Sequence, residues 1–159
     1  MELNLLDNLK QHQSICLQVS ATTWEDAVYQ CIKPLIDKDL VTYAYYEAII
    51  ASTLRYGPYY IIADGLAMPH AQSSTAVKAN GFSLVTLKAP IYFRDDNRPV
   101  QVLVGLAATS AEIHTAQALP QIVAIFEEQK VIEAIAKATT EQEVFAIISQ
   151  IDLMKYINK

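Results

Sequence analysis

The sequence predicts a single-domain α/β fold, in which a mixed central sheet of about five strands is flanked by helices on both faces. Three observations lead to this prediction. Segments with strand character alternate with segments of helical periodicity, which is the pattern of a sheet layered by helices. The run 100–107 is almost continuously apolar, as expected of a central strand covered on both faces. The 159 residues fit one domain, 1–159, without an internal repeat or linker.

The composition limits the classes of function. A hydrophobic fraction of 52% with 18% charged residues indicates an ordered globule. The net charge of -5 and the absence of a basic stripe argue against nucleic-acid binding. No apolar run reaches membrane-spanning length and no basic segment precedes an apolar signal, so a cytoplasmic protein without membrane insertion is expected. Cys16 and Cys31 lack C-x-x-C spacing, which argues against a disulfide scaffold or thiolate zinc site.

The first third of the chain is expected to hold helix, strand, helix and helix. Leucines within 3–9 suit a short helix, and alternation over 14–19 predicts a half-buried strand, with His12 in the connector. Thr22 and Glu25 have capping-box spacing for the next helix. Two further signals are a proline expected to kink the end of that helix and a threonine expected to cap the following one: Pro34 and Thr42.

The next segment presents a histidine on a restricted backbone. Residues 59–63 read as a buried strand, and Asp64 with Gly65 predicts a turn. Pro69 fixes its own φ and biases the preceding residue toward extended geometry. His70 therefore follows a segment with few conformations to lose. Its imidazole titrates near neutrality and suits phosphoryl acceptance, metal ligation or general base catalysis, although a structural histidine at a strand end is the simpler alternative.

The second half is expected to contain two strands and three helices. A polar loop over 72–80 leads to a strand at 81–87, an apolar bend at 89–93 and a charged turn at 94–99. The central strand 100–107 follows. Two C-terminal helices, the second with a Thr140–Glu143 capping box, are predicted over 128–138 and 141–151.

Between these segments, Ser110 is a good N-cap for a helix that has His114 near its start and Pro120 within it. His114 would then lie near a helix N-terminus just past a central strand, a position that favours anions. An exposed helix histidine is the alternative interpretation.

The stretch Gly-Leu-Ala-Met-Pro-His at 65–70 resembles the phosphoacceptor motif of the enzyme IIA components of the bacterial phosphoenolpyruvate:sugar phosphotransferase system, of the mannitol and fructose structural class. Within that class, Gly-Pro-Tyr-Tyr at 57–60 and the strand at 81–88 resemble the ascorbate branch. The resemblance extends over nearly the whole chain.

This resemblance implies a phosphoryl relay that needs no cofactor or metal. His70 would accept a phosphoryl group from the carrier protein HPr and pass it to a cysteine of a IIB partner, which serves a membrane IIC permease, with L-ascorbate as the sugar expected. His114 would stabilise the phosphoryl group. Arg55 is carried over weakly, because its spacing to His70 is one residue shorter than the family pattern and a cation near a helix C-terminus needs no other explanation. Leu66 and Met68 are expected to form an apolar docking rim.

Two alternatives stay open at this point. The same fold could be a nitrogen-type regulatory phosphoprotein, whose phosphorylation alters a partner and moves no sugar. Alternatively, His70, His114 and Asp64 could ligate zinc in a hydrolase, although no local H-E-x-x-H spacing supports this.

Overall fold

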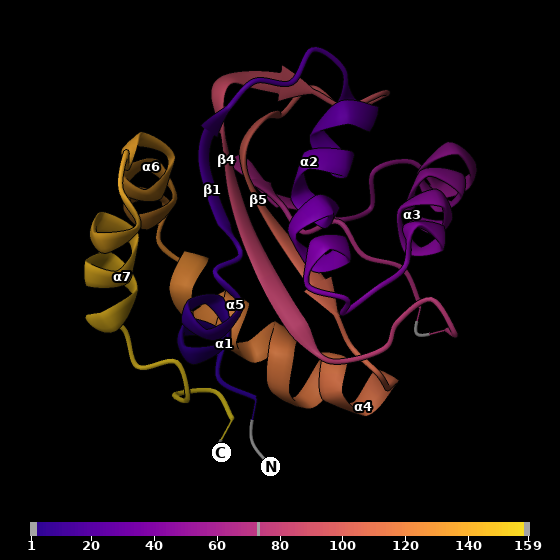
Figure 1. Cartoon of the computed structure of the whole chain (residues 1–159). Helices are drawn as coiled ribbons and strands as arrows, with labels where there is room; N and C mark the ends of the chain where they lie inside the picture. Colours follow the sequence, from indigo (N-terminus) through magenta and orange to yellow (C-terminus); the bar gives the residue numbers. More distant parts are fainter. Residues whose placement is uncertain (1–2, 73, 158–159) are drawn as a thin grey trace.

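The computed structural model describes residues 3–72 and 74–157, and its centre is one five-stranded sheet in the order β1-β4-β5-β3-β2 (Figure 1). The strands are β1 (Ile15–Val19), β2 (Ile61–Ala63), β3 (Gly65–Ala67), β4 (Gly81–Tyr92) and β5 (Pro99–Ala107). β1 and β4 are parallel, as are β3 and β5, whereas β4–β5 and β2–β3 are antiparallel. The predicted mixed sheet of five strands is confirmed.

Helices cover both faces of this sheet, as predicted (Figure 1). One face packs against α1 (Leu5–His12), α5 (Leu119–Phe126), α6 (Gln129–Lys137) and α7 (Glu141–Ser149). The other face packs against α2 (Trp24–Asp37) and α3 (Tyr43–Tyr56). Each face therefore has its own hydrophobic cluster. None of the helices in the described ranges is long and apolar enough to cross a membrane.

The N-terminal elements differ in detail from the prediction. α1 extends to His12, so this histidine ends a helix and does not lie in a connector. α2 is capped by Thr23, whose side chain accepts from the Asp26 N–H, one residue later than the predicted capping box. The helix continues past Pro34 to Asp37. The expected alternation in β1 breaks at Gln18, where φ is +57° and the register with β4 shifts.

The middle of the chain also differs from the prediction. Only the last three residues of the predicted strand 59–63 are β-structure, and β2 is an edge strand with Ile62 43% exposed. Successive side chains of a strand point to opposite faces, so Ile61 is buried at 4% exposure while Ile62 faces the solvent. The bend predicted at 89–93 is instead part of β4, which pairs with β5 on both sides of a register irregularity between Thr86 and Ile91.

At the C-terminus the capping box that opens α7 is confirmed. The Thr140 side chain accepts from the Glu143 N–H, and the Glu143 carboxylate accepts from the Thr140 N–H. Both bonds satisfy backbone donors that the helix start would otherwise leave unpaired.

The close approach of α2 to the sheet yields a test of the fold. Gly105 on β5 lies opposite Ser83 on β4, and an added Cβ would stand 2.2 Å from the Ser83 Oγ and 3.1 Å from the Cys31 carbonyl oxygen. We expect Gly105→Ala to lower the free energy of unfolding by about 1–3 kcal/mol, the usual cost of overpacking. Urea unfolding would measure this loss.

The matched control is a double-mutant cycle with Ser83→Ala. Ser83→Ala removes the hydroxyl oxygen, which is the atom nearest to the added Cβ. The Cys31 carbonyl oxygen, 3.1 Å from the added Cβ, stays in place. Ser83→Ala should therefore recover part of the stability lost in Gly105→Ala. If Gly105→Ala costs the same stability with and without the Ser83 hydroxyl, the contact with that hydroxyl is not the cause.

Candidate active site

His70 follows β3, and its ring is held by the backbone that precedes it. The Met68 N–H donates to the Tyr60 carbonyl at 2.8 Å, which continues the pairing toward β2. The Met68 carbonyl lies 2.7 Å from the Nδ1 of His70. Because a carbonyl only accepts, Nδ1 must carry the proton in this contact. The neutral ring then has its free lone pair on Nε2.

Two tyrosines hold the backbone at His70 and Ala71. The Tyr59 hydroxyl donates to the His70 carbonyl, and the Ala71 N–H donates to the Tyr45 hydroxyl at 3.2 Å. The Tyr59 ring also stands perpendicular to the imidazole, with ring centroids 5.4 Å apart. The loop that carries His70 is therefore anchored by hydrogen bonds on both sides.

His114 comes from a widened turn between two α-helical segments. Ser110 caps α4 (Ala111–Ile113) by accepting from the Ile113 N–H, which confirms the predicted N-cap. The π-helical turn η1 (His114–Ala118) follows, and the Leu119 N–H donates to the His114 carbonyl. The widening lies directly before Pro120, which has no N–H to continue the α-helical bonding. Single π turns of this kind are common at functional sites.

The two histidines meet at the end of the central strands. Their ring centroids are 4.8 Å apart with an interplanar angle of 43°. Burial lowers the pKa of His70, and the hydrogen bond to the Met68 carbonyl opposes this only in part. Burial also lowers the pKa of His114, and the neighbouring His70 lowers it further. Both shifts favour the neutral, unprotonated rings that a nucleophile requires.

Two hollows open beside this pair. The first has a volume of about 380 Å³ and is lined by both histidines; its lining is Tyr45, His70, Ala71, Gln72, Ala108, Ala111, His114 and Thr115. The second has a volume of about 740 Å³ and separates His70 from α3; its lining is Ala48, Ala51, Ser52, Arg55, Tyr56, Tyr59, His70, Ala71, Gln72 and Ser74. His70 is thus accessible from both.

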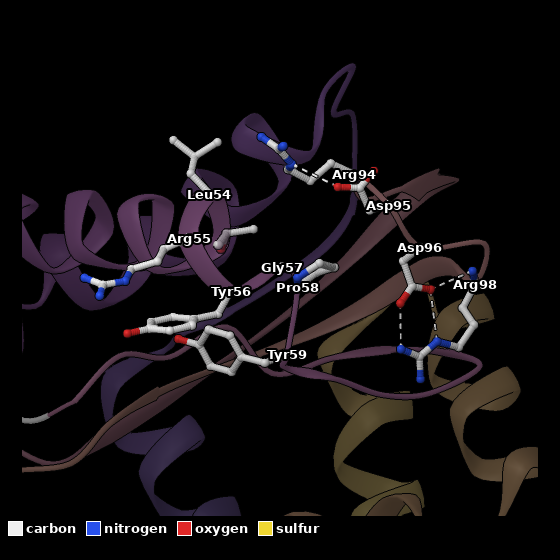
Figure 2. Close-up of a pocket in the computed structure, with 11 residues that line it drawn as sticks. Leu54, Arg55, Tyr56, Gly57, Pro58, Tyr59, Arg94, Asp95, Asp96 and Arg98 are labelled. Atoms are coloured by element: carbon white, nitrogen blue, oxygen red, sulfur yellow. Dashed lines mark hydrogen bonds and ion pairs between the residues drawn. The ribbon is translucent and has the colours of Figure 1, made fainter.

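Arg55 lies in the last turn of α3 and lines the larger hollow together with His70. Its guanidinium carbon stands 5.2 Å from the centroid of the Tyr56 ring. Arg55, Tyr56 and Tyr59 also line a third hollow, of about 510 Å³, on the side of the charged β4–β5 turn. Figure 2 shows these three side chains extending in the same direction, away from the Asp96–Arg98 ion pair.

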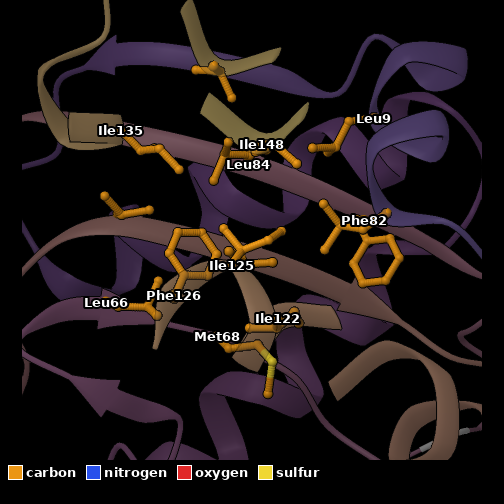
Figure 3. Close-up of a cluster of buried hydrophobic side chains, with 14 of the residues drawn as sticks. Leu9, Leu66, Met68, Phe82, Leu84, Ile122, Ile125, Phe126, Ile135 and Ile148 are labelled. Atoms are coloured by element: carbon orange, nitrogen blue, oxygen red, sulfur yellow. The ribbon is translucent and has the colours of Figure 1, made fainter. Parts of the chain in front are cut away.

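The predicted docking role of Leu66 and Met68 is wrong. Leu66 is 1% exposed and Met68 is 3% exposed, so neither can form an exposed rim. Both side chains lie in the cluster beneath α5 and α6, where Figure 3 shows Met68 beside Ile122. Side chains of a strand point to the faces of the sheet, and the face that carries Leu66 and Met68 is covered by α5 and α6.

The zinc-site alternative is also contradicted. Asp64 lies in the turn at the opposite end of β3, where its carbonyl accepts from the Gln129 side chain of α6. It lines neither hollow beside the histidines. Within 3–72 and 74–157, no group of three His, Cys, Asp or Glu side chains could hold a metal ion.

Comparison with known proteins agrees with this geometry. Residues 8–151 match the family model described as phosphoenolpyruvate-dependent sugar phosphotransferase system, EIIA 2. The chain is 50% identical over 149 residues to the ascorbate-specific PTS system EIIA component of Mycoplasma pneumoniae, covering 94% of each chain. It is 42% identical to the corresponding Escherichia coli K12 protein, covering 93% of this chain and 97% of that one.

A solved structure is similar over almost the whole chain. The PTS IIA protein PtxA from Streptococcus mutans superimposes with a TM-score of 0.92 at 43% identity, covering 99% of this chain and 100% of that chain. EIIA components of this system are phosphotransferases that carry a phosphohistidine intermediate. The chain, with its paired histidines at the end of a mixed five-stranded sheet, belongs to the EIIA 2 family of the phosphoenolpyruvate-dependent sugar phosphotransferase system.

Proposed function

We propose that His70 is the phosphoacceptor of this EIIA component and that Nε2 is the phosphorylated nitrogen. One observation carries the proposal: Nδ1 is hydrogen-bonded to the Met68 carbonyl at 2.7 Å, so the neutral ring has its nucleophilic lone pair on Nε2. The ring is fixed in one orientation beside two hollows that admit a donor. A positioned nucleophile lowers the entropic part of the barrier to phosphoryl transfer.

The reaction is a direct exchange of phosphorus–nitrogen bonds. The Nε2 lone pair of His70 forms a bond to phosphorus as the bond between phosphorus and the histidine of phospho-HPr breaks. His114, 4.8 Å away between ring centroids, and Arg55 on the rim of the larger hollow would stabilise the charge on the phosphoryl oxygens. In the second step a cysteine thiolate of a IIB protein takes the phosphoryl group and His70 becomes free again.

We further propose that the relay serves L-ascorbate uptake through a IIC permease, with this chain acting in the cytoplasm. The relatives at 42–50% identity are named ascorbate-specific, and this supports the transport role over a nitrogen-type regulatory role. A IIB partner is supported in outline by a solved complex of the mannitol IIA domain of Escherichia coli with phosphorylated IIB, whose IIA fold this chain shares at a TM-score of 0.75 and 18% identity.

The experiment that tests the proposal is intact mass spectrometry after incubation with phosphoenolpyruvate, enzyme I and HPr. We expect the chain to gain one acid-labile phosphoryl group and to lose it when an ascorbate-type IIB protein is added. A mannitol-type IIB protein serves as the specificity control. A chain that remains unmodified while HPr is fully phosphorylated would refute the relay.

The lowered pKa of His70 predicts the pH dependence of this reaction. A histidine with its pKa below the ordinary value of 6.5 is more than half neutral at pH 6.5, because less than half of a base is protonated at any pH above its pKa. We therefore expect phosphoryl acceptance to persist at pH 6.5 and to fall as the pH drops through the lowered pKa. NMR titration of the His70 ring would give the midpoint, with His12→Ala used to remove the signal of a histidine outside the site. A midpoint above 6.5 would contradict the prediction.

A further inference from the structure

We infer that Tyr59 is a positioning residue that keeps His70 in its nucleophilic orientation. This inference rests on the proposed function of His70 and adds a residue outside the predicted histidine and arginine set. Tyr59 contacts His70 twice, through a hydrogen bond from its hydroxyl to the His70 carbonyl and through a perpendicular ring contact at 5.4 Å. The first contact fixes the backbone of the nucleophile, and the second limits the rotation of its ring.

Tyr59 is itself held in place by the turn between α3 and β2. Gly57 ends α3 with φ of +80°, a conformation that suits glycine, and the Tyr59 N–H donates to the Gly57 carbonyl at 2.9 Å. The Tyr59 ring packs edge-on against Tyr60 at 5.0 Å. Tyr60 is fully buried and its hydroxyl is 2.7 Å from the Thr53 Oγ1. Tyr59 is therefore anchored to α3 through Tyr60 and Thr53.

Tyr59 lies at the surface and not in the core. Its side chain is 44% exposed, and it lines both the hollow beside His70 and the neighbouring hollow at the charged turn. Figure 2 shows its hydroxyl extending beside Tyr56 toward the side of Arg55. Partial burial also raises the pKa of Tyr59, which keeps the hydroxyl protonated and able to donate.

The bond from the Tyr59 hydroxyl to the His70 carbonyl and the bond from Nδ1 to the Met68 carbonyl both favour the tautomer with its proton on Nδ1. The Met68 carbonyl holds the proton on Nδ1 only while the ring and the loop keep their relative position. Without the Tyr59 bond, the peptide between His70 and Ala71 keeps the bond from its N–H to the Tyr45 hydroxyl but loses the one to its carbonyl, so the loop is held less firmly and the Nδ1 contact weakens. The neutral ring can then exchange its proton to Nε2, which removes the lone pair that attacks phosphorus.

The test compares Tyr59→Phe with the native chain by two readouts. Phenylalanine keeps the ring contact and removes only the hydroxyl. We expect the rate of phosphorylation at saturating phospho-HPr to fall about fivefold while KM changes less than about twofold, an effect of the size of one lost hydrogen bond. NMR of the His70 ring nitrogens, measured without any phosphoryl donor, should show a smaller fraction of the Nδ1–H tautomer than in the native chain.

Tyr92→Phe is the matched control, because Tyr92 is 61% exposed on β4 and lines none of the three hollows. It should leave both the rate and the tautomer unchanged. An unchanged tautomer in Tyr59→Phe would overturn the inference, and so would an increase in KM at constant kcat, which would make Tyr59 a docking residue. The tautomer readout needs no phosphorylation, so it remains decisive even if the proposed relay is wrong.

Discussion

His70→Ala is expected to lose phosphoryl acceptance from phospho-HPr, with a rate at least about 10³-fold below the native rate. The change removes the nitrogen that forms the new bond to phosphorus. His114 is nearby, but among the described residues no carbonyl holds its ring in one tautomer, whereas the Met68 carbonyl holds His70. Intact mass spectrometry before and after mild acid treatment measures the loss directly.

His12→Ala is the matched control for this variant, because the chain has three histidines and His12 lies at the end of α1, outside both hollows. It should accept one phosphoryl group at the native rate. Thermal unfolding would show that both variants are folded. An acid-labile phosphoryl group on folded His70→Ala would instead assign the acceptor role to His114.

Much of the fold was predictable because the local signals agreed with the tertiary packing. The apolar run that became β5 lies at the centre of the sheet, and Ser110 and Thr140 begin helices as their side chains suggested. The position of His114 followed from this cap. The pairing of two histidines 44 positions apart in sequence came from the family resemblance, and the structure brings their rings to 4.8 Å.

Other features depend on contacts that no local pattern records. Leu66 and Met68 precede the histidine, and only the packing of α5 and α6 on that face of the sheet shows that their side chains point into the core. Tyr45 and Tyr46 have similar local signals, yet Tyr45 is the buried one and its hydroxyl accepts from the loop after His70. The only sequence signal near Tyr59 is the Gly57-Pro58 turn before it, and a turn does not show that the Tyr59 ring contacts His70.

His114→Ala is expected to slow phosphoryl acceptance about 100-fold at saturating phospho-HPr without abolishing it. The nucleophile remains, but the variant loses a ring that can donate a hydrogen bond to the phosphoryl oxygens beside His70. Negative charge that arrives beside His114 favours its protonated form, which opposes the lowering of its pKa in the unphosphorylated protein. Rapid quenching of the reaction at a series of times, followed by mass spectrometry, would give the rate.

His114→Gln separates the two contributions of this ring, because glutamine keeps an N–H donor and cannot become a cation. A rate between those of His114→Ala and the native chain would indicate that donation and charge both act. The phosphorylated form of His114→Ala should also hydrolyse faster, because the phosphoryl group has lost a neighbour that shields it. A native rate in folded His114→Ala would show that the ring contact at 4.8 Å does not contribute to transfer, and Arg55 with the backbone would then have to stabilise the charge.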